Sequence, residues 1–136
     1  MADVATANPS FEDTPFVFDW RDIERGVPLA ALDDFATYSA IPARDLVNAV
    51  IPPRTLKHRR QRKEPLSPEE SDRLARVAKM YELAVKVYGN REDGRGWLLH
   101  PTDRFEGRTP LSLLKTEAGE RSVEEFLYQI DEGVFA

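Results

Sequence analysis

Residues 67–89, SPEESDRLARVAKMYELAVKVYG, carry the strongest helix signal in the chain and decide its fold class. Ser67, Pro68 and Glu70 have the arrangement of a capping box with proline at the first helical position, and Gly89 supplies a stop. Between these ends, apolar side chains recur at the spacing of one buried helix face: Leu74, Val77, Ala78, Tyr81, Ala84, Val85 and Tyr88. The pattern predicts a long central helix in an all-α protein.

Towards the N-terminus, proline, glycine and capping residues divide the chain into short helices. Residues 1–14 are small and polar without periodicity, so we expect a flexible tail. The predicted helices are a short one capped by Asp19 or Asp22 and ended by Gly26, one from Pro28 to near Ser39, and two at about residues 42–49 and 53–62.

On the C-terminal side the signals are a charged, glycine-bearing loop and two further helices. Residues 90–96 predict the loop. Thr109 and Pro110 predict a helix of little more than two turns, and Thr116 caps a last helix that ends at Gly133.

Length and composition favour a soluble globular protein with one modest core. The chain has 136 residues, of which 41% are hydrophobic and 32% charged. The absence of cysteine excludes disulfides, thiol catalysis and cysteine-ligated metal sites. No apolar run approaches the ~20 residues that span a bilayer, and the start of the chain lacks a signal-peptide pattern, so we expect a cytoplasmic location without membrane contact.

Positive charge is concentrated in one short segment. The net charge is −5, yet residues 54–63 hold six Lys or Arg and no Asp or Glu. Leu56 is the one apolar residue among them, so most of this predicted helix faces solvent. A solvated surface helix is the ordinary explanation of such a run.

The context favours DNA binding instead. Two short helices joined by a tight turn, the second densely cationic, have the layout of a helix-turn-helix, although the same spacing occurs in any three-helix bundle. Arginine and lysine offset phosphate charge, and arginine also binds guanine edges. The predicted DNA-binding residues, with Thr55 and Arg59 assigned to bases and the others to phosphates, are Arg54, Thr55, Lys57, His58, Arg59, Arg60 and Arg62.

The central helix has an apolar face wider than one packing partner covers. These residues are either core or a contact with a second copy. We expect a homodimer, because helix-turn-helix proteins use two recognition helices one DNA turn apart. The predicted dimerisation residues, within a central region at 67–100, are Tyr81, Leu83, Val87 and Tyr88.

Catalytic and metal-binding motifs are missing from the sequence. It contains no phosphate-binding glycine loop, HExxH or GxSxG motif. His58 and His100 have no partner at metal-ligand spacing. We therefore predict no enzyme activity, no metal and no cofactor.

Two stretches resemble the Xre/MbcA/ParS antitoxins of RES/Xre toxin–antitoxin operons. One is the basic segment followed by LSPEESDRL at residues 66–74. The other, more specific, comprises GRTPLSLL at 107–114, TEAG at 116–119 and the ending GVFA at 133–136. The resemblance covers about residues 28–136, with departures at Pro42, where the family often has a Ser or Thr cap, and at Glu106, where it has glycine.

The resemblance implies three parts after the tail: a helix-turn-helix part at residues 15–66, the central region, and a C-terminal toxin-binding module at 101–136. The implied partners are operator DNA and a cognate RES-domain toxin, an enzyme that consumes NAD; the antitoxin blocks its active site and represses the shared operon. The residues predicted to contact the toxin are Tyr128, Asp131, Gly133, Val134, Phe135 and Ala136. The alternative is a stand-alone dimeric helix-turn-helix repressor without a toxin partner.

Overall fold

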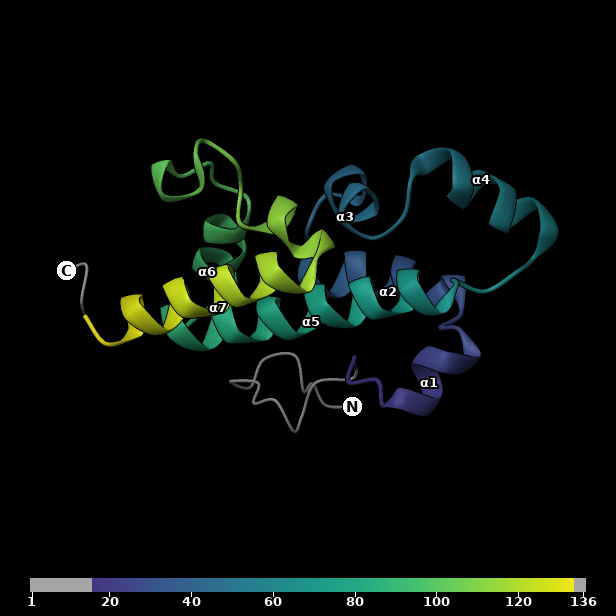
Figure 1. The fold of residues 1–136 in the computed structure, drawn as a ribbon, viewed down its shortest axis with the longest axis horizontal. Helices are drawn as coiled ribbons and strands as arrows, with labels where there is room; N and C mark the ends of the chain where they lie inside the picture. The colour runs from purple at the N-terminus through teal and green to yellow at the C-terminus, as the bar shows by residue number, and fades with distance from the viewer. Residues whose placement is uncertain (1–15, 134–136) are drawn as a thin grey trace.

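A computed structural model describes residues 16–133, which form helices and connecting loops with no β-strand in this range (Figure 1). The all-α prediction is confirmed, and the predicted tail at residues 1–14 lies outside the described range. The α-helices are α1 (Trp20–Arg25), α2 (Leu29–Ser39), α3 (Ala43–Val50), α4 (Pro53–Arg62), α5 (Pro68–Tyr88), α6 (Arg91–Leu98) and α7 (Glu117–Asp131), with 3-10 helices η3 (Asp103–Phe105) and η4 (Leu111–Lys115).

Helix α5 is the axis on which most of the other elements pack. Ser67 Oγ accepts from the Glu70 N–H at 3.1 Å and the Glu70 side chain accepts from the Ser67 N–H at 2.8 Å, so the predicted capping box is present. Gly89 ends the helix with φ +84°, a left-handed conformation that favours glycine. Helix α3 packs near its start, α2 contacts it at Tyr81 and Glu82, and α7 lies along it (Figure 1). The long central helix is therefore confirmed with the predicted ends.

Residues 90–96 are the clearest departure from the sequence prediction. Residues 91–96 belong to α6 and Asn90 is its N-cap, so the predicted loop is wrong. The Asn90 side chain accepts from the Asp93 N–H at 2.8 Å and caps this helix. A Cβ on Gly94 would lie 2.8 Å from the backbone N of Val85, so Gly94 permits α6 to approach α5 closely. This glycine serves packing rather than a turn.

A row of aromatic rings holds the C-terminal elements together. Tyr88 on α5 contacts Trp97 on α6, with ring centroids 6.4 Å apart. Trp97 contacts Phe126 on α7 at 5.7 Å, and Phe126 contacts Phe105 at 5.6 Å. The Tyr88–Trp97 pair is tilted and the other two are edge-on, and aromatic pairs at these distances add to the stabilisation from burial. The row fixes α6, η3 and α7 against the end of α5.

The remaining departures concern helix ends. Residues 111–115 form one short 3-10 helix instead of two α-helical turns, and Thr116 then caps α7 as predicted, accepting from the Gly119 N–H at 3.0 Å. Asp19 is the cap of α1. Pro42 precedes α3 without a side-chain capping bond, and Glu106 has φ +58°, where glycine is less strained.

Candidate functional site: a cationic helix and a C-terminal helical module

Helix α4 stands at one end of the molecule, apart from the bundle around α5 (Figure 1). Proline at its first position suits the fixed φ of that residue, and the turn at Ile51 and Pro52 separates it from α3. Leu56 is its buried residue, at 8% exposed. The short helix, tight turn and second helix predicted from the sequence are therefore present.

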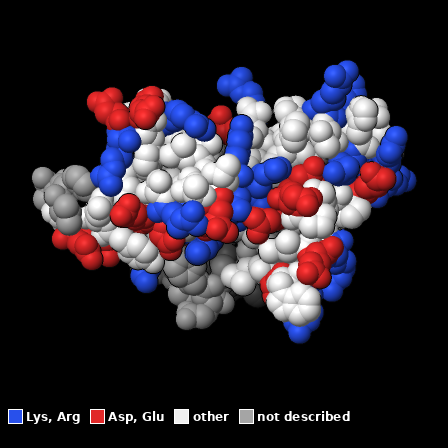
Figure 2. Space-filling model, in the orientation of Figure 1, with Lys and Arg blue, Asp and Glu red and all other residues white. Residues whose placement is uncertain are grey.

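The outward face of α4 carries cations. Five exposed residues recur at the spacing of one helix face: Arg54, Lys57, His58, Gln61 and Arg62. Within the described range, the Arg54, Lys57 and Arg62 side chains have no ion-pair partner. Figure 2 shows Lys and Arg side chains gathered over the α4 end of the molecule. Gln61 is uncharged, so the charge pattern of the sequence does not indicate it as a site residue. Its position on the outward face of α4 does.

Two of the predicted DNA-binding arginines have partners within the chain. Arg59 Nη2 lies 3.0 Å from Glu70 Oε2 and 3.2 Å from Glu70 Oε1, and Nε donates to Oε1 at 3.3 Å. The Arg59 side chain is only 24% exposed, and that of Glu70 8%. Arg59 is therefore a brace between α4 and α5, and its base contact stays a prediction. Thr55, at the edge of the outward face, is half-buried.

Arg60 has a looser partner on α2. Its guanidinium forms two hydrogen bonds with the Asp33 carboxylate, at 2.9 and 3.2 Å. The hydrogen bonds that the Arg60 guanidinium donates to Asp33 raise the pKa of Arg60 above its ordinary value, so this guanidinium stays charged. The Arg60 side chain remains 46% exposed, which leaves it able to reach a phosphate near the edge of α4.

We expect Arg59→Ala to lower the free energy of unfolding by about 2 kcal/mol, because it leaves the buried Glu70 carboxylate without its cation. This loss of stability is smaller than the loss expected on breaking a fully buried ion pair, because the Arg59 side chain is 24% exposed. Urea unfolding at neutral pH measures it. Arg62→Ala, an exposed cation on the same helix, is the matched control and should change stability by less than about 0.5 kcal/mol. If both substitutions lower the free energy of unfolding equally, Arg59 does not brace α4 against α5.

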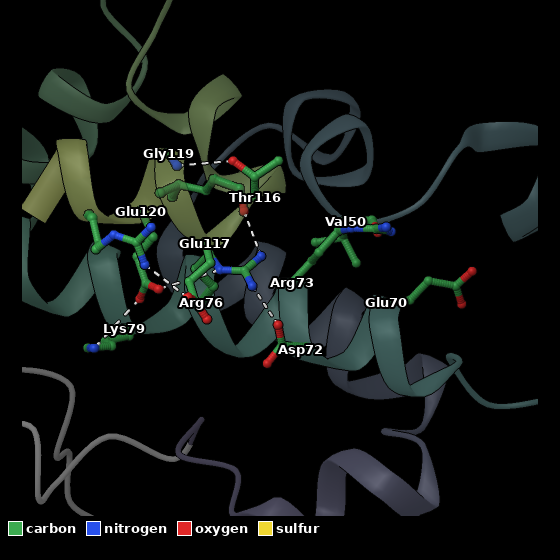
Figure 3. A network of polar contacts seen from close by, with 12 residues as sticks. Val50, Glu70, Asp72, Arg73, Arg76, Lys79, Thr116, Glu117, Gly119 and Glu120 are labelled. Carbon is green, nitrogen blue, oxygen red and sulfur yellow. Dashed lines mark hydrogen bonds and ion pairs between the residues drawn. The ribbon is translucent and has the colours of Figure 1, made fainter.

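Basic residues of α5 connect both parts of the chain (Figure 3). Arg73 Nη1 donates to the Val50 carbonyl at 3.2 Å, at the end of α3. Arg76 Nη1 donates to the Leu114 carbonyl at 3.0 Å, and its Nε lies 3.6 Å from Glu120 Oε1. Lys79 Nζ is 3.6 Å from the other oxygen of Glu120. Neighbouring turns of one helix therefore hold the helix-turn-helix part and the C-terminal module.

The C-terminal residues predicted to bind a partner lie at the solvent side of α7 and just beyond it. Tyr128 is 49% exposed, and Asp131 is exposed in the last turn. Gly133 is exposed with φ +79°. Val134, Phe135 and Ala136 lie outside the described residues. The structure brings Tyr128 and Asp131 onto one helix, three residues apart.

Two of the four predicted dimerisation residues are buried in their own chain. Tyr81 is 0% exposed and Leu83 4% exposed, so both side chains pack mainly within their own chain instead of forming the predicted contact with a second copy. Burial also raises the pKa of the Tyr81 hydroxyl above its ordinary value. Val87 and Tyr88 are half-buried, and Tyr88 faces Trp97. Apolar periodicity identified this helix face, but the same chain covers it.

Metal-ligating clusters and membrane-spanning helices are both absent from residues 16–133. No group of three or more His, Cys, Asp or Glu side chains in this range is placed to hold a metal ion. No helix in it is long and apolar enough to cross a membrane.

The fold defines a class: an all-helical protein in which a helix-turn-helix with a cationic second helix is joined through one long helix to a C-terminal helical module. Comparison with family models agrees with this division. Residues 21–79 match the antitoxin Xre-like helix-turn-helix domain, and residues 83–133 match the antitoxin Xre/MbcA/ParS C-terminal toxin-binding domain.

Curated relatives point the same way. A protein named Antitoxin Xre from Yersinia enterocolitica is 32% identical over 84% of this chain and 78% of its own length. An Antitoxin Xre from Pseudomonas putida is 46% identical over 62% of this chain but only 53% of its own length, so the match spans about half of that relative. An Antitoxin Xre from Photorhabdus laumondii is 26% identical over 82% of this chain. The chain belongs to the Xre/MbcA/ParS family of antitoxins, which are not enzymes.

Proposed function

We propose that this antitoxin binds and occludes a RES-domain toxin that consumes NAD, and that it represses its own operon through α4. The observation that carries the proposal is the adjacency of the two matched domains, a helix-turn-helix and a toxin-binding domain, in one chain. The proposed surfaces lie at opposite ends of the molecule: α4 at one end and the last turn of α7 at the other (Figure 1).

The charge distribution supports operator DNA as the partner of α4. A protein with a net charge of −5 binds a polyanion only where cations gather on an accessible surface. The outward face of α4 offers such a surface, with Arg54, Lys57 and Arg62 unpaired within the described range. We assign phosphate contacts to these three, with His58 beside them, and base contacts to Thr55 and Gln61. Two copies of α4 then require a homodimer, for which Val87 and Tyr88 remain the proposed contacts.

The second candidate is a dimeric repressor without a toxin. The same α4 geometry favours it, since nothing in the helix-turn-helix part depends on a toxin. The discriminating property is whether the chain forms a complex with the product of the neighbouring gene.

Co-expression with the adjacent open reading frame tests the proposal. We expect the neighbouring product alone to deplete cellular NAD and arrest growth, and the antitoxin to prevent both and to co-purify with it. An antitoxin with Arg54, Lys57 and Arg62 all replaced by alanine should neutralise equally well while failing to repress. Growth arrest that persists despite soluble antitoxin, or a failure to co-purify, would reject the toxin part and favour the stand-alone repressor.

A further inference from the structure

A groove of about 710 Å³ is lined by residues of α5 and α7 and by residues 16–18. Its apolar lining includes Phe16, Phe18, Ala75, Ala78 and Leu83. A cavity of this size is in the range of small-ligand and peptide sites.

Exposed apolar side chains gather around this groove. In the described range, the large hydrophobic residues with high exposure are Val17 at 65%, Trp20 at 62% and Tyr128 at 49%. Val17 and Tyr128 line the groove, whereas Trp20, at the start of α1, is not part of its lining. Exposed apolar side chains concentrated at one place mark an interaction surface.

A buried carboxylate in the groove wall has an unused hydrogen-bonding atom. Glu82 is 4% exposed and lines the groove. The Tyr38 hydroxyl donates to Glu82 Oε2 at 2.6 Å, whereas Oε1 has no hydrogen-bond partner among the described residues. An unpaired buried oxygen of this kind is costly. Because Oε1 itself has no exposed surface, a ligand that supplies an N–H donor removes this cost only when the groove wall shifts to admit it.

The rest of the groove is also acidic. Carboxylates in its lining outnumber cations by five to two, and both cations, Arg76 and Lys79, already pair with Glu120. The charge excludes a nucleic acid as the occupant and favours a positively charged one. Apolar walls, an acidic rim and an unsatisfied buried acceptor together fit an apolar segment that carries a lysine or arginine.

We propose that this groove binds a segment of the toxin in which a lysine or arginine, flanked by apolar side chains, donates to Glu82. The inference rests on the proposed toxin partner. The toxin is chosen as the occupant because the α7 wall of the groove, together with Leu83 on α5, lies within the matched toxin-binding domain at residues 83–133. The rest of the α5 wall, from Asp72 to Lys79, lies in the helix-turn-helix match, so the segment would contact residues of both matched domains.

Binding of the purified toxin, measured by calorimetry with the full chain, tests the groove. Ala75→Trp fills it from α5, and we expect about 100-fold weaker binding. Glu82→Gln keeps the side-chain shape and an oxygen to accept from Tyr38 but removes the charge, and we expect about 30-fold weaker binding. Glu69→Trp, an exposed α5 position outside the groove, is the matched control and should bind as the unmodified protein does. Circular dichroism and the melting temperature verify that each variant is folded.

Cross-linking then identifies the occupant. With p-benzoylphenylalanine in place of Tyr128, irradiation of the complex should join the groove to a toxin peptide that contains a lysine or arginine. If the unmodified protein does not bind the toxin, the proposed function itself fails. If it binds but Glu82→Gln and Ala75→Trp bind equally well, or the cross-link joins two antitoxin chains, the function stands and the groove assignment is overturned.

Discussion

Replacing Gly119 with alanine is expected to lower the free energy of unfolding by about 3 kcal/mol or more. Gly119 lies in the first turn of α7, where its N–H donates to the Thr116 cap at 3.0 Å. A Cβ at this position would overlap the carbonyl oxygen of Leu113 and lie 2.8 Å from its carbonyl carbon. Both atoms belong to the backbone of η4, so no side-chain rotation relieves the clash. The first turn of α7 must move away from η4, and the C-terminal module loosens.

Gly96→Ala provides the matched control for this prediction. Gly96 is also helical, but nothing lies within 4 Å of a Cβ built there, and its φ is not positive. Alanine at this exposed site should raise stability by about 0.5–1 kcal/mol through the lower entropy of the unfolded chain. Thermal and urea unfolding of both variants measure the difference. Equal stability of Gly119→Ala and the unmodified protein would show that η4 and α7 do not pack as described.

Simultaneous replacement of Arg54, Lys57 and Arg62 by alanine is expected to weaken binding to the DNA upstream of the gene by about 100-fold, at about 1 kcal/mol for each phosphate interaction removed. These side chains project from one face of α4 and have no ion-pair partner in the described range. Stability should be nearly unchanged, because none of them is buried. Removing each cation from a phosphate should also flatten the plot of log affinity against log salt by about 0.9.

Fluorescence anisotropy with labelled DNA at several salt concentrations measures both quantities. A triple alanine variant at exposed cations away from α4, namely Arg25, Lys115 and Arg121, controls for the change in net charge. If the two triple variants weaken binding equally, binding follows total charge and not the α4 face. An unchanged salt dependence in the α4 variant would remove this helix from the DNA interface.

Sequence signals locate most helices because their ends are local. Ser67, Thr116, Gly26 and Gly89 each cap or end the helix predicted for them, and each acts on residues within one turn. Helix α6 escapes prediction because Gly94, taken in isolation, is typical of a helix breaker. Its role in packing is apparent only in the folded structure, where a Cβ built on Gly94 would lie 2.8 Å from the backbone N of Val85 in α5.

The candidate site shows the same limit. The sequence indicates a cationic helix, and the inward position of Leu56 follows from its apolar side chain. The sequence does not distinguish Arg59 and Arg60 from the outward-facing cations, because their partners are distant in the chain. Glu70 is 11 residues from Arg59, and Asp33 is 27 residues from Arg60. The sequence predicts Glu70 as a capping residue, which it is, but its carboxylate also accepts from Arg59. Only tertiary structure reveals that second role.

Helix α5 is continuous over 21 residues, which at 1.5 Å per residue makes a rod of about 30 Å. An uninterrupted rod of this length acts as a spacer whose reach does not depend on loops. Helix α4 and the last turn of α7 lie near opposite ends of this rod (Figure 1), so partners bound at these two surfaces would not compete for room. The architecture thus permits a ternary assembly in which one antitoxin chain holds both at a fixed offset.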